Sequence, residues 1–172
     1  MRGGFSHIGL STLDLDRTRE FYEGVLGMPA VRCDTIEVKE GGRIRHIFFD
    51  AGEGQLLAFM EPRGVEGIPA EYDAGINRGL GVPDAFYHLA FEVGSVEALE
   101  AKRAALIARG VAVSPVVDHG WMKSIYFKDP NGLMLEFACT TRQLGDPDDA
   151  KMQVRFRARF ADLELSRHLK NR

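Results

Sequence analysis

Two segments of the chain read alike, and this internal repeat limits the possible fold more than any other feature of the sequence. Residues 5–10 (FSHIGL) and 86–91 (FYHLAF) are both short, apolar, strand-like runs with a histidine at the third position. A helical pattern of apolar residues follows each run, over about 14–26 and about 95–109. Each half therefore predicts a strand followed by a helix.

The predicted helices carry ordinary capping signals at both ends. Asp14 or Asp16 is suited to cap the first helix and Ser95 the second, because short polar side chains accept hydrogen bonds from the free N–H groups of the first turn. Gly27 and Gly110 follow the last helical residues, where the chain often takes a positive φ.

Three strand-like segments follow each helix and complete the repeat. The closing hairpins of the two halves, 48–59 and 126–137, align without a gap, and the second contains the strong turn sequence Asp-Pro-Asn-Gly over 129–132. The sequence therefore predicts an α+β fold of two tandem βαβββ modules that form a cupped mixed sheet, within one domain spanning 1–172. The predicted strands after the helices are 30–38, 43–50 and 55–61 in the first module (5–61), and 111–118, 121–128 and 133–139 in the second (86–140).

Two segments lie outside the repeat. Residues 62–85 contain five glycines and three prolines, which fits either a linker or a loop over a pocket. If this segment covers a pocket, Tyr72, Asn77 and Arg78 are its useful polar groups. Residues 146–172 begin with a helix-start signal, and they predict a C-terminal helix docked on the body of the protein or on a partner subunit.

The overall composition excludes several classes of function. The 172 residues carry a net charge of −3, so the chain lacks the basic character of a nucleic-acid-binding protein. No apolar run approaches the roughly 20 residues of a membrane span, and the first residues lack the apolar stretch of a signal peptide. Cys33 and Cys139 are far apart in the sequence and have no metal-like spacing. We therefore expect a cytoplasmic protein that binds neither nucleic acid nor membrane.

Three residues with metal-binding side chains stand at equivalent or complementary positions of the repeat. His7 and His88 occupy the same place in their first strands. The last strand carries Glu136 in the second module and Ala58 at the matching place in the first. Two imidazoles and one carboxylate suit a borderline divalent cation. The alternative for Glu136 is the outward, solvated face of a half-exposed strand.

The paired modules, the strand histidines and the segment 124–137 (SIYFKDPNGLMLEF) resemble the vicinal oxygen chelate superfamily. This superfamily includes glyoxalase I, methylmalonyl-CoA epimerase, fosfomycin-resistance transferases, bleomycin-sequestering proteins and extradiol ring-cleaving dioxygenases. The resemblance covers about 5–140 and implies strands curled around a metal ion. It also implies a homodimer, with the modules paired within one chain or exchanged between two.

The residue at position 58 distinguishes the members of this superfamily. Glyoxalase I and the epimerase have a fourth ligand, Glu or Gln, at the position that matches Ala58. Extradiol dioxygenases use His, His and Glu at the positions that match His7, His88 and Glu136, which leaves room for a catecholate and O₂. The resemblance thus implies an oxygen-using, ring-cleaving enzyme with Fe(II) favoured, and with Mn(II), Zn(II) or Ni(II) as other candidates. A glyoxalase or epimerase, a thiol transferase and a metal-free binding protein stay open as alternatives.

The resemblance also suggests roles for residues near the metal. Extradiol enzymes carry a tyrosine at the spacing of Tyr126 and a histidine in the region of His119, so both become catalytic candidates, and His119 is equally well read as an exposed turn residue. Phe48 matches Tyr126 in the repeat. His46 lies two residues before Phe48 and therefore shares the face of Phe48. His46 is read either as an acid or base of the site or as a solvated residue of an edge strand. The predicted substrate-binding residues are Phe48, Asn77 and Arg78.

Overall fold

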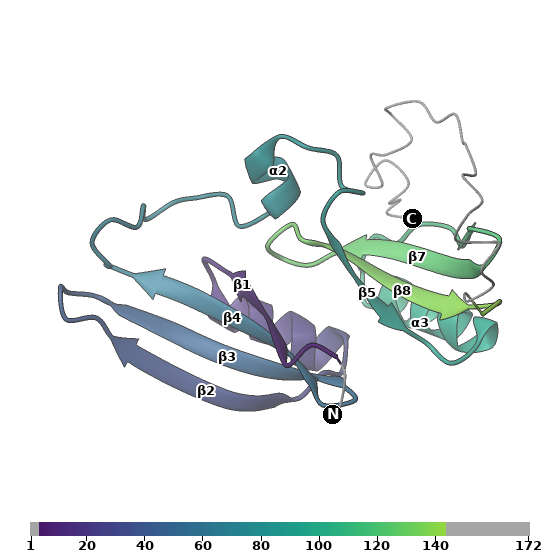
Figure 1. The fold of residues 1–172 in the computed structure, drawn as a ribbon, viewed down its shortest axis with the longest axis horizontal. Coiled ribbons are helices and arrows are strands. Elements are labelled where there is room, and N and C mark those ends of the chain that lie inside the picture. Colours follow the sequence, from purple (N-terminus) through teal and green to yellow (C-terminus); the bar gives the residue numbers. More distant parts are fainter. Residues whose placement is uncertain (1–3, 144–172) are drawn as a thin grey trace. The chain divides into compact units, whose positions relative to one another are not determined.

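The computed structural model describes residues 4–143 and divides the chain into two compact units (Figure 1). Unit 1 consists of Met1–Gly79 together with Asp129–Gly132, and unit 2 of Leu80–Lys128 together with Leu133–Arg172. The chain therefore leaves unit 2 for a four-residue turn that belongs to unit 1, and then returns to unit 2. The predicted C-terminal helix at 146–172 lies outside the described residues.

Unit 1 contains the first βαβββ module. Its sheet has the strand order β1-β4-β3-β2, in which β1 and β4 are parallel and the other pairs are antiparallel. The helix begins after Asp14, whose side chain accepts a hydrogen bond from the amide of Arg17, so Asp14 rather than Asp16 is the N-cap. The elements are β1 (His7–Ser11), α1 (Leu15–Arg19), η1 (Glu20–Val25), β2 (Ala30–Glu37), β3 (Arg43–Gly52) and β4 (Gln55–Arg63).

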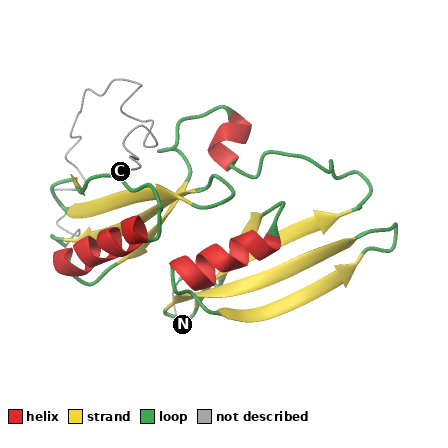
Figure 2. Ribbon diagram, turned by 180° about the vertical axis from the view of Figure 1, so that it is seen from behind, coloured by secondary structure: helices red, strands yellow, loops and turns green. Residues whose placement is uncertain are grey.

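The predicted helix over 14–26 is not α-helical throughout. Its second half, η1, is π-helical, with the amide of Leu26 bonded to the carbonyl of Phe21. This helical segment covers one face of the sheet (Figure 2). On that face, Tyr22 stacks on Phe49 with ring centroids 5.2 Å apart, and its ring centroid lies 4.8 Å from that of Phe59. The consecutive residues Phe21 and Tyr22 of this π-helical turn are both buried.

The turn Asp129–Gly132 is tied to unit 1 by polar side chains. The Tyr22 hydroxyl donates to Asp129 Oδ2 at 3.2 Å. Asn131 accepts from the Thr12 hydroxyl at 2.7 Å and donates to Thr18 Oγ1 at 3.2 Å. Buried polar groups must find partners within the protein, and here the turn predicted from its Asp-Pro-Asn-Gly sequence supplies them to the first helix.

Unit 2 contains the second βαβββ module, with the matching strand order β5-β8-β7-β6 and a parallel β5–β8 pair. Ser95 caps the helix as predicted, and its hydroxyl accepts from the amide of Ala98 at 3.1 Å. The helix covers one face of the sheet (Figure 2), and Leu99 and Leu106 are its buried residues. The elements are β5 (His88–Glu92), α3 (Val96–Ala108), β6 (Val117–Asp118), β7 (Met122–Lys128) and β8 (Met134–Thr140).

The predicted strand over 111–118 is mostly irregular. Only β6 pairs regularly with β7, and an isolated bridge joins Val113 to Phe127. Pro115 lies between them and has no N–H group to give to a sheet, which explains the interruption.

The structure confirms the α+β fold class with two βαβββ modules. The segment 62–85 is not entirely irregular, because it contains the short helix α2 (Ile76–Leu80). Among the described residues, no helix has the length and apolar character needed to cross a membrane.

A buried carboxylate ties the helix to the sheet in unit 1. Glu61 is fully buried on β4 and accepts from Arg45 Nε at 2.5 Å, from an Arg63 guanidinium nitrogen at 2.7 Å and from the amide of Leu15 at 3.1 Å. Burial works to raise the pKa of Glu61, but the hydrogen bonds from Arg45 and Arg63 outweigh it and hold the pKa at about 2.

This arrangement predicts a loss of stability in acid. The unfolded chain binds a proton at Glu61 near its ordinary pKa of 4.5, whereas the folded chain does so only near 2. Stability from Glu61 is therefore fully present above about pH 5 and is lost as the pH falls towards 2. In Glu61→Gln, the free energy of unfolding should fall less over this pH range, by an amount of the order of 3 kcal/mol. Urea denaturation between pH 2 and 7 measures it.

The exposed Glu66 provides a matched control. Glu66→Gln should keep the wild-type pH profile. If Glu61→Gln also keeps it, the ion pairs of Glu61 do not set the acid sensitivity of unit 1.

Candidate metal centre

In unit 2, three of the predicted site residues lie on the sheet face opposite α3. Tyr126 on β7 is directly opposite Glu136 on β8, and Glu136 pairs on its other side with Ala90 of β5. His88 lies two residues before Ala90 and so points to the same side. The apolar residues between them, such as Phe127 and Phe137, point to the helix side and form the core.

His88 and Glu136 form a direct pair on this face. His88 Nε2 lies 3.0 Å from Glu136 Oε2, and the other ring nitrogen, Nδ1, lies 3.1 Å from the carbonyl oxygen of Ala85. The Glu136 side chain is 1% exposed and that of His88 33%. This burial overturns the alternative of an outward, solvated Glu136. A carboxylate inside an apolar strand is instead paired with an imidazole, as buried charges require.

The pair is held by mutual stabilisation of its charged forms. The hydrogen bond with Glu136 raises the pKa of His88 against the effect of burial. Burial works to raise the pKa of Glu136, and the hydrogen bond from His88 outweighs it, so the pKa lies below its ordinary value. The second carboxylate oxygen, Oε1, is buried and has no hydrogen-bond partner.

Tyr126 and His119 form a second pair in unit 2. His119 Nε2 lies 2.9 Å from the Tyr126 hydroxyl, although His119 itself stands in an exposed turn. Burial, and then the charge of Glu136, raise the pKa of Tyr126 to about 12. The phenol therefore stays protonated at neutral pH and can donate a hydrogen bond. The two predicted catalytic residues of the second module are thus in contact.

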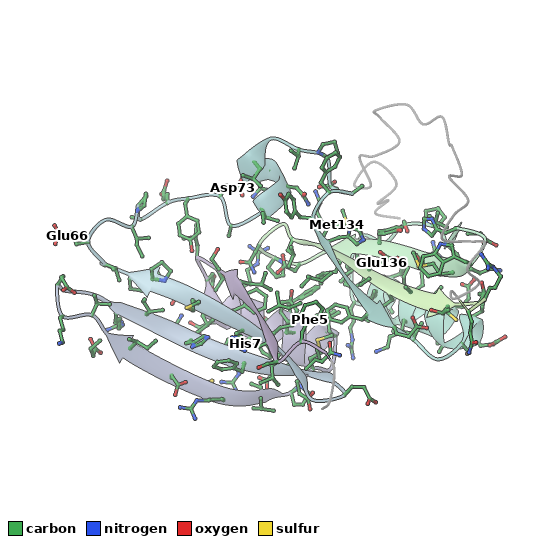
Figure 3. The ribbon with its side chains drawn as sticks, viewed as in Figure 1. Phe5, His7, Glu66, Asp73, Met134 and Glu136 are labelled. Carbon is green, nitrogen blue, oxygen red and sulfur yellow. The ribbon has the colours of Figure 1, made fainter. Side chains whose placement is uncertain are left out.

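The corresponding face of unit 1 has the same register. His7 pairs with Leu56 and Gly9 with Ala58, just as His88 pairs with Met134 and Ala90 with Glu136. Phe48 is opposite Ala58 as Tyr126 is opposite Glu136. The gap-free alignment of the two hairpins therefore describes the real strand pairing. In the first module, Ala58 occupies the position that Glu136 has in the second. Figure 3 labels Glu136 and also His7 of the first module.

Three aromatic rings gather on this face of unit 1. Phe48 lies 4.2 Å from the His46 ring and 5.9 Å from the His7 ring, measured between centroids. His46 Nε2 is buried and without a hydrogen-bond partner, and burial lowers the pKa of His46. His46 therefore shares a face with Phe48 and His7, as predicted from its spacing.

Two of the predicted substrate-binding residues, Asn77 and Arg78, lie in α2. Asn77 is buried, and Arg78 forms an ion pair with Asp73, with Nε 2.5 Å from Oδ2. Arg78 also borders a cavity of about 180 Å³ in unit 1, together with Tyr72, Arg17 and other residues. Their role in substrate binding stays a prediction.

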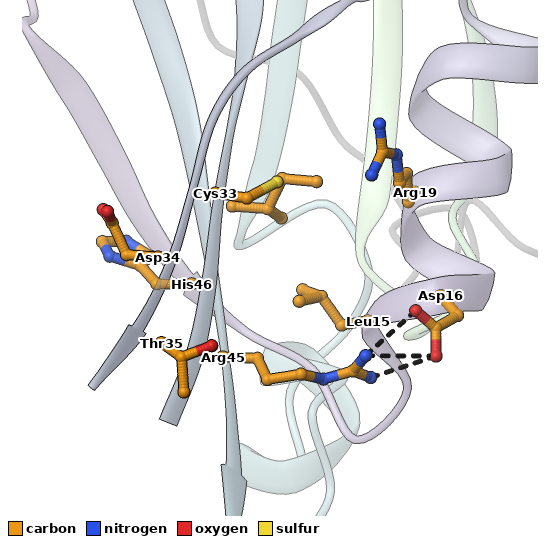
Figure 4. Close-up of a pocket in the computed structure, with 9 residues that line it drawn as sticks. Leu15, Asp16, Arg19, Cys33, Asp34, Thr35, Arg45 and His46 are labelled. Atoms are coloured by element: carbon orange, nitrogen blue, oxygen red, sulfur yellow. Dashed lines mark hydrogen bonds and ion pairs between the residues drawn. The ribbon is translucent and has the colours of Figure 1, made fainter. Parts of the chain in front are cut away.

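A larger cavity of about 240 Å³ in unit 1 lies beside α1 and β2 and is bordered by Cys33, Arg45 and His46 (Figure 4). The Arg45 guanidinium within it is bound to Asp16 at 3.0 Å. Within either unit taken alone, the described residues gather no group of three His, Cys, Asp or Glu side chains that could hold a metal ion. The triad of His7, His88 and Glu136 thus stays a prediction, of which the pair in unit 2 is in contact.

Two features of the site were not predicted from the sequence. The first is the Ala85 carbonyl that binds His88, which cannot be recognised from the sequence because every residue has a backbone carbonyl. Ser124 is fully buried two residues before Tyr126 and lies on the same face. Its spacing along the strand could have indicated this position.

Comparison with known proteins identifies the family of the chain. A family model described as "Glyoxalase/Bleomycin resistance protein/Dioxygenase superfamily" matches residues 4–137. A comparison with curated proteins finds no match.

Several solved structures have a similar fold. A glyoxalase/bleomycin resistance protein/dioxygenase from Nocardioides is 26% identical, with a TM-score of 0.56, over 84% of this chain and 91% of that chain. The fosfomycin resistance protein FosX from Listeria monocytogenes is 22% identical, with a TM-score of 0.55, over 82% and 96% of the two chains. TnmS3, an antibiotic binding protein from Streptomyces sp. CB03234, is 18% identical, with a TM-score of 0.55, over 81% and 97%. The last two similarities show a shared fold alone.

The burial of Ala58 leads to a prediction about this position, which matches Glu136 in the second module. Ala58 is 1% exposed and lies opposite Phe48. Ala58→Glu places a carboxylate there without a buried cation, and should lower the free energy of unfolding of the metal-free protein by roughly 3–5 kcal/mol. Ala58→Met, of similar length but uncharged, separates the steric cost from the electrostatic one in the same denaturation experiment. Equal losses in the two variants would mean that water reaches this position freely.

Proposed function

Because the chain belongs to the glyoxalase/bleomycin resistance protein/dioxygenase superfamily, as its sequence motifs indicated, we propose that it is a metal-dependent enzyme for a small substrate with vicinal oxygens. The reaction type that we favour is ring cleavage by an extradiol dioxygenase. The observation that carries this proposal is the grouping of His88, Glu136, Tyr126 and His119 on one face of the second module. It combines a metal-binding pair with an acid–base pair.

His88 and Glu136 fit a divalent cation in their present contacts. Histidine ligands commonly give their other N–H to a carbonyl or carboxylate, and His88 Nδ1 faces the Ala85 carbonyl in this way. The remaining Nε2 and the Glu136 Oε2 are turned towards each other. His7, which has the register position of His88 in its own module, is the proposed third ligand, from the same chain or from a second copy.

A bound cation would polarise two substrate oxygens and neutralise the charge that develops on them. The chain's own residues supply the proton chemistry. The Tyr126 hydroxyl donates to a substrate oxygen, and His119 Nε2, which lies 2.9 Å from it, accepts or returns a proton through the phenol. Phe48 provides an apolar wall, and His46, Asn77 and Arg78 stay candidates for an acid or base and for polar contacts to the substrate.

Ala58 favours the dioxygenase over the other members of the superfamily. An alanine cannot replace the fourth ligand of the glyoxalase and epimerase pattern, whereas two histidines and one carboxylate are a common ligand set of Fe(II) oxygenases. A metal-free binding protein has no need of a carboxylate buried against an imidazole, given the cost of burying its charge. We therefore propose Fe(II) as the metal and O₂ as the second substrate.

The remaining proposals concern the assembly and its setting. The superfamily resemblance favours a homodimer. Cys33 and Cys139 are both free thiols, which is compatible with the reducing cytoplasm that we propose as its location.

The three proposed ligands predict a common metal-binding defect. Protein purified without oxygen should bind one Fe(II) or Mn(II) per chain, measured by elemental analysis and calorimetry. His7→Ala, His88→Ala and Glu136→Ala should each abolish stoichiometric binding, because each removes one of three ligands. His168, which is outside the repeat, offers a control whose alanine variant should bind normally.

Far-ultraviolet circular dichroism should show that the three variants keep the fold. Unchanged metal affinity in Glu136→Ala would refute the ligand role of Glu136. The wild-type protein should then be screened with catechols while O₂ uptake is recorded. Isomerase or thiol-transfer assays would replace this screen if no oxygen is consumed.

Tyr126→Phe should keep the metal and the fold but lower turnover by about 10²-fold, as for removal of a donor aimed at developing charge. The backbone amide of Tyr126 keeps its hydrogen bond to Ser114 in this variant, so the strand is undisturbed. Tyr22→Phe is the matched control, because it removes a buried phenol bound to Asp129 in unit 1. It should lower stability and leave turnover unchanged. Wild-type turnover in a fully metallated Tyr126→Phe protein would make Tyr126 a packing residue.

A further inference from the structure

Three buried side-chain atoms of the described residues have no hydrogen-bond partner: His46 Nε2, Ser124 Oγ and Glu136 Oε1. Unpartnered buried polar atoms are uncommon, and each costs free energy that the folded state must offset. Two of the three belong to unit 2. Their occurrence together suggests a state of the protein in which both are satisfied.

Ser124 and Glu136 are neighbours on the same sheet face. Ser124 pairs with Ala138, and Glu136 pairs with Tyr126, so the two residues stand diagonally across the antiparallel β7–β8 ladder. Diagonal neighbours of this kind come within reach of each other's side chains. Ser124 is 0% exposed and Glu136 1%, so water has little access to either side chain.

The two atoms are also chemically complementary. An ionised carboxylate only accepts hydrogen bonds, while a serine hydroxyl can donate one and turns about a single bond. Glu136 Oε2 is engaged by His88, and Oε1 is the oxygen that lacks a donor. Ser124 is the neighbour whose hydroxyl stands in hydrogen-bonding geometry with no other described group.

We propose that Ser124 is a positioning residue for Glu136, whose hydroxyl donates to Oε1 and holds the carboxylate with Oε2 directed at the metal. This inference rests on the proposed metal site. Ligating carboxylates are generally held by such outer hydrogen bonds, and losing one costs about 10–100-fold in metal affinity. In the metal-free protein the Ser124 hydroxyl and Glu136 Oε1 are not in hydrogen-bonding geometry, although the nearby Ser124 already helps to lower the pKa of Glu136. Most of its contribution to positioning therefore appears when the metal binds.

The alternative role of Ser124 is packing, in which a small side chain fills the space beneath Tyr126 and Glu136. The two roles differ in their consequences. A packing role changes the stability of the metal-free protein, whereas a positioning role changes metal affinity and leaves that stability as it was.

The test uses Co²⁺ as the probe, because its visible absorption reports the ligand field. Ser124→Ala should raise the dissociation constant for Co²⁺ by about 10–100-fold without lowering the urea midpoint of the metal-free protein. Ser124→Thr, which keeps the hydroxyl, should bind Co²⁺ nearly as tightly as the wild type. Should Ser124→Ala fold poorly, Ser124→Cys, with a weak donor of similar size, should give an intermediate affinity.

Ser114 offers a matched control in the same unit. It is also fully buried, but its hydroxyl donates to the Pro115 carbonyl at 2.7 Å and accepts from the Tyr126 amide at 3.0 Å. Ser114→Ala should therefore lower the urea midpoint of the metal-free protein and leave the Co²⁺ dissociation constant close to that of the wild type.

A double-mutant cycle completes the test. In a Glu136→Ala background, residual Co²⁺ binding should be the same with and without Ser124→Ala, because the hydroxyl then has no carboxylate to hold. Wild-type affinity in Ser124→Ala, or a lowered metal-free midpoint with unchanged affinity, would overturn the positioning role alone. A wild-type protein that binds no Co²⁺, Fe(II) or Mn(II) would overturn the proposed metal enzyme together with it.

Discussion

A single helical segment covers only one face of each four-stranded sheet, and this constraint separates the core from the chemistry in both modules. Strand side chains alternate between the two faces. Tyr22, Phe49 and Phe59 in unit 1, and Phe127 and Phe137 in unit 2, therefore pack on the helix side. Histidines and Glu136 are left on the other side. One repeat thus yields both a conventional apolar core and a second face that carries the histidines and the carboxylate.

The same strand register carries different chemistry in the two modules. In the second, Glu136 and Tyr126 are cross-strand partners, and in the first, Ala58 and Phe48 take these places. The glutamate and its phenol neighbour are therefore present once per chain, while the strand histidine is present twice. The proposed triad combines the two strand histidines with this single carboxylate.

Much of this could be predicted from the sequence, because it depends on local patterns. The modules followed from the apolar periodicity, from the capping residues (Asp14 or Asp16, and Ser95) and from the gap-free hairpin alignment. The equivalence of His7 and His88 followed from the same repeat. Other features depend on contacts that a linear pattern does not contain. Residue spacing left two environments possible for Glu136, and burial against His88 decides between them. The π-helical form of η1 and the Ala85 carbonyl at His88 are features of the backbone without a sequence signature.

The assignment of Asp129–Gly132 to unit 1 has a consequence for how the chain is made. Tyr22, Thr12 and Thr18 find polar partners more than 100 residues further along the sequence. Thr12 and Thr18 also bond to each other and to the Asp14 carbonyl, whereas the partner of the Tyr22 hydroxyl is Asp129. During synthesis, this buried phenol therefore waits for its partner until the second hairpin has left the ribosome. Contacts with such long sequence separation are slow to form. A fragment that ends after the first module would leave the Tyr22 hydroxyl without Asp129, so unit 1 is complete only when the turn from the second hairpin is present.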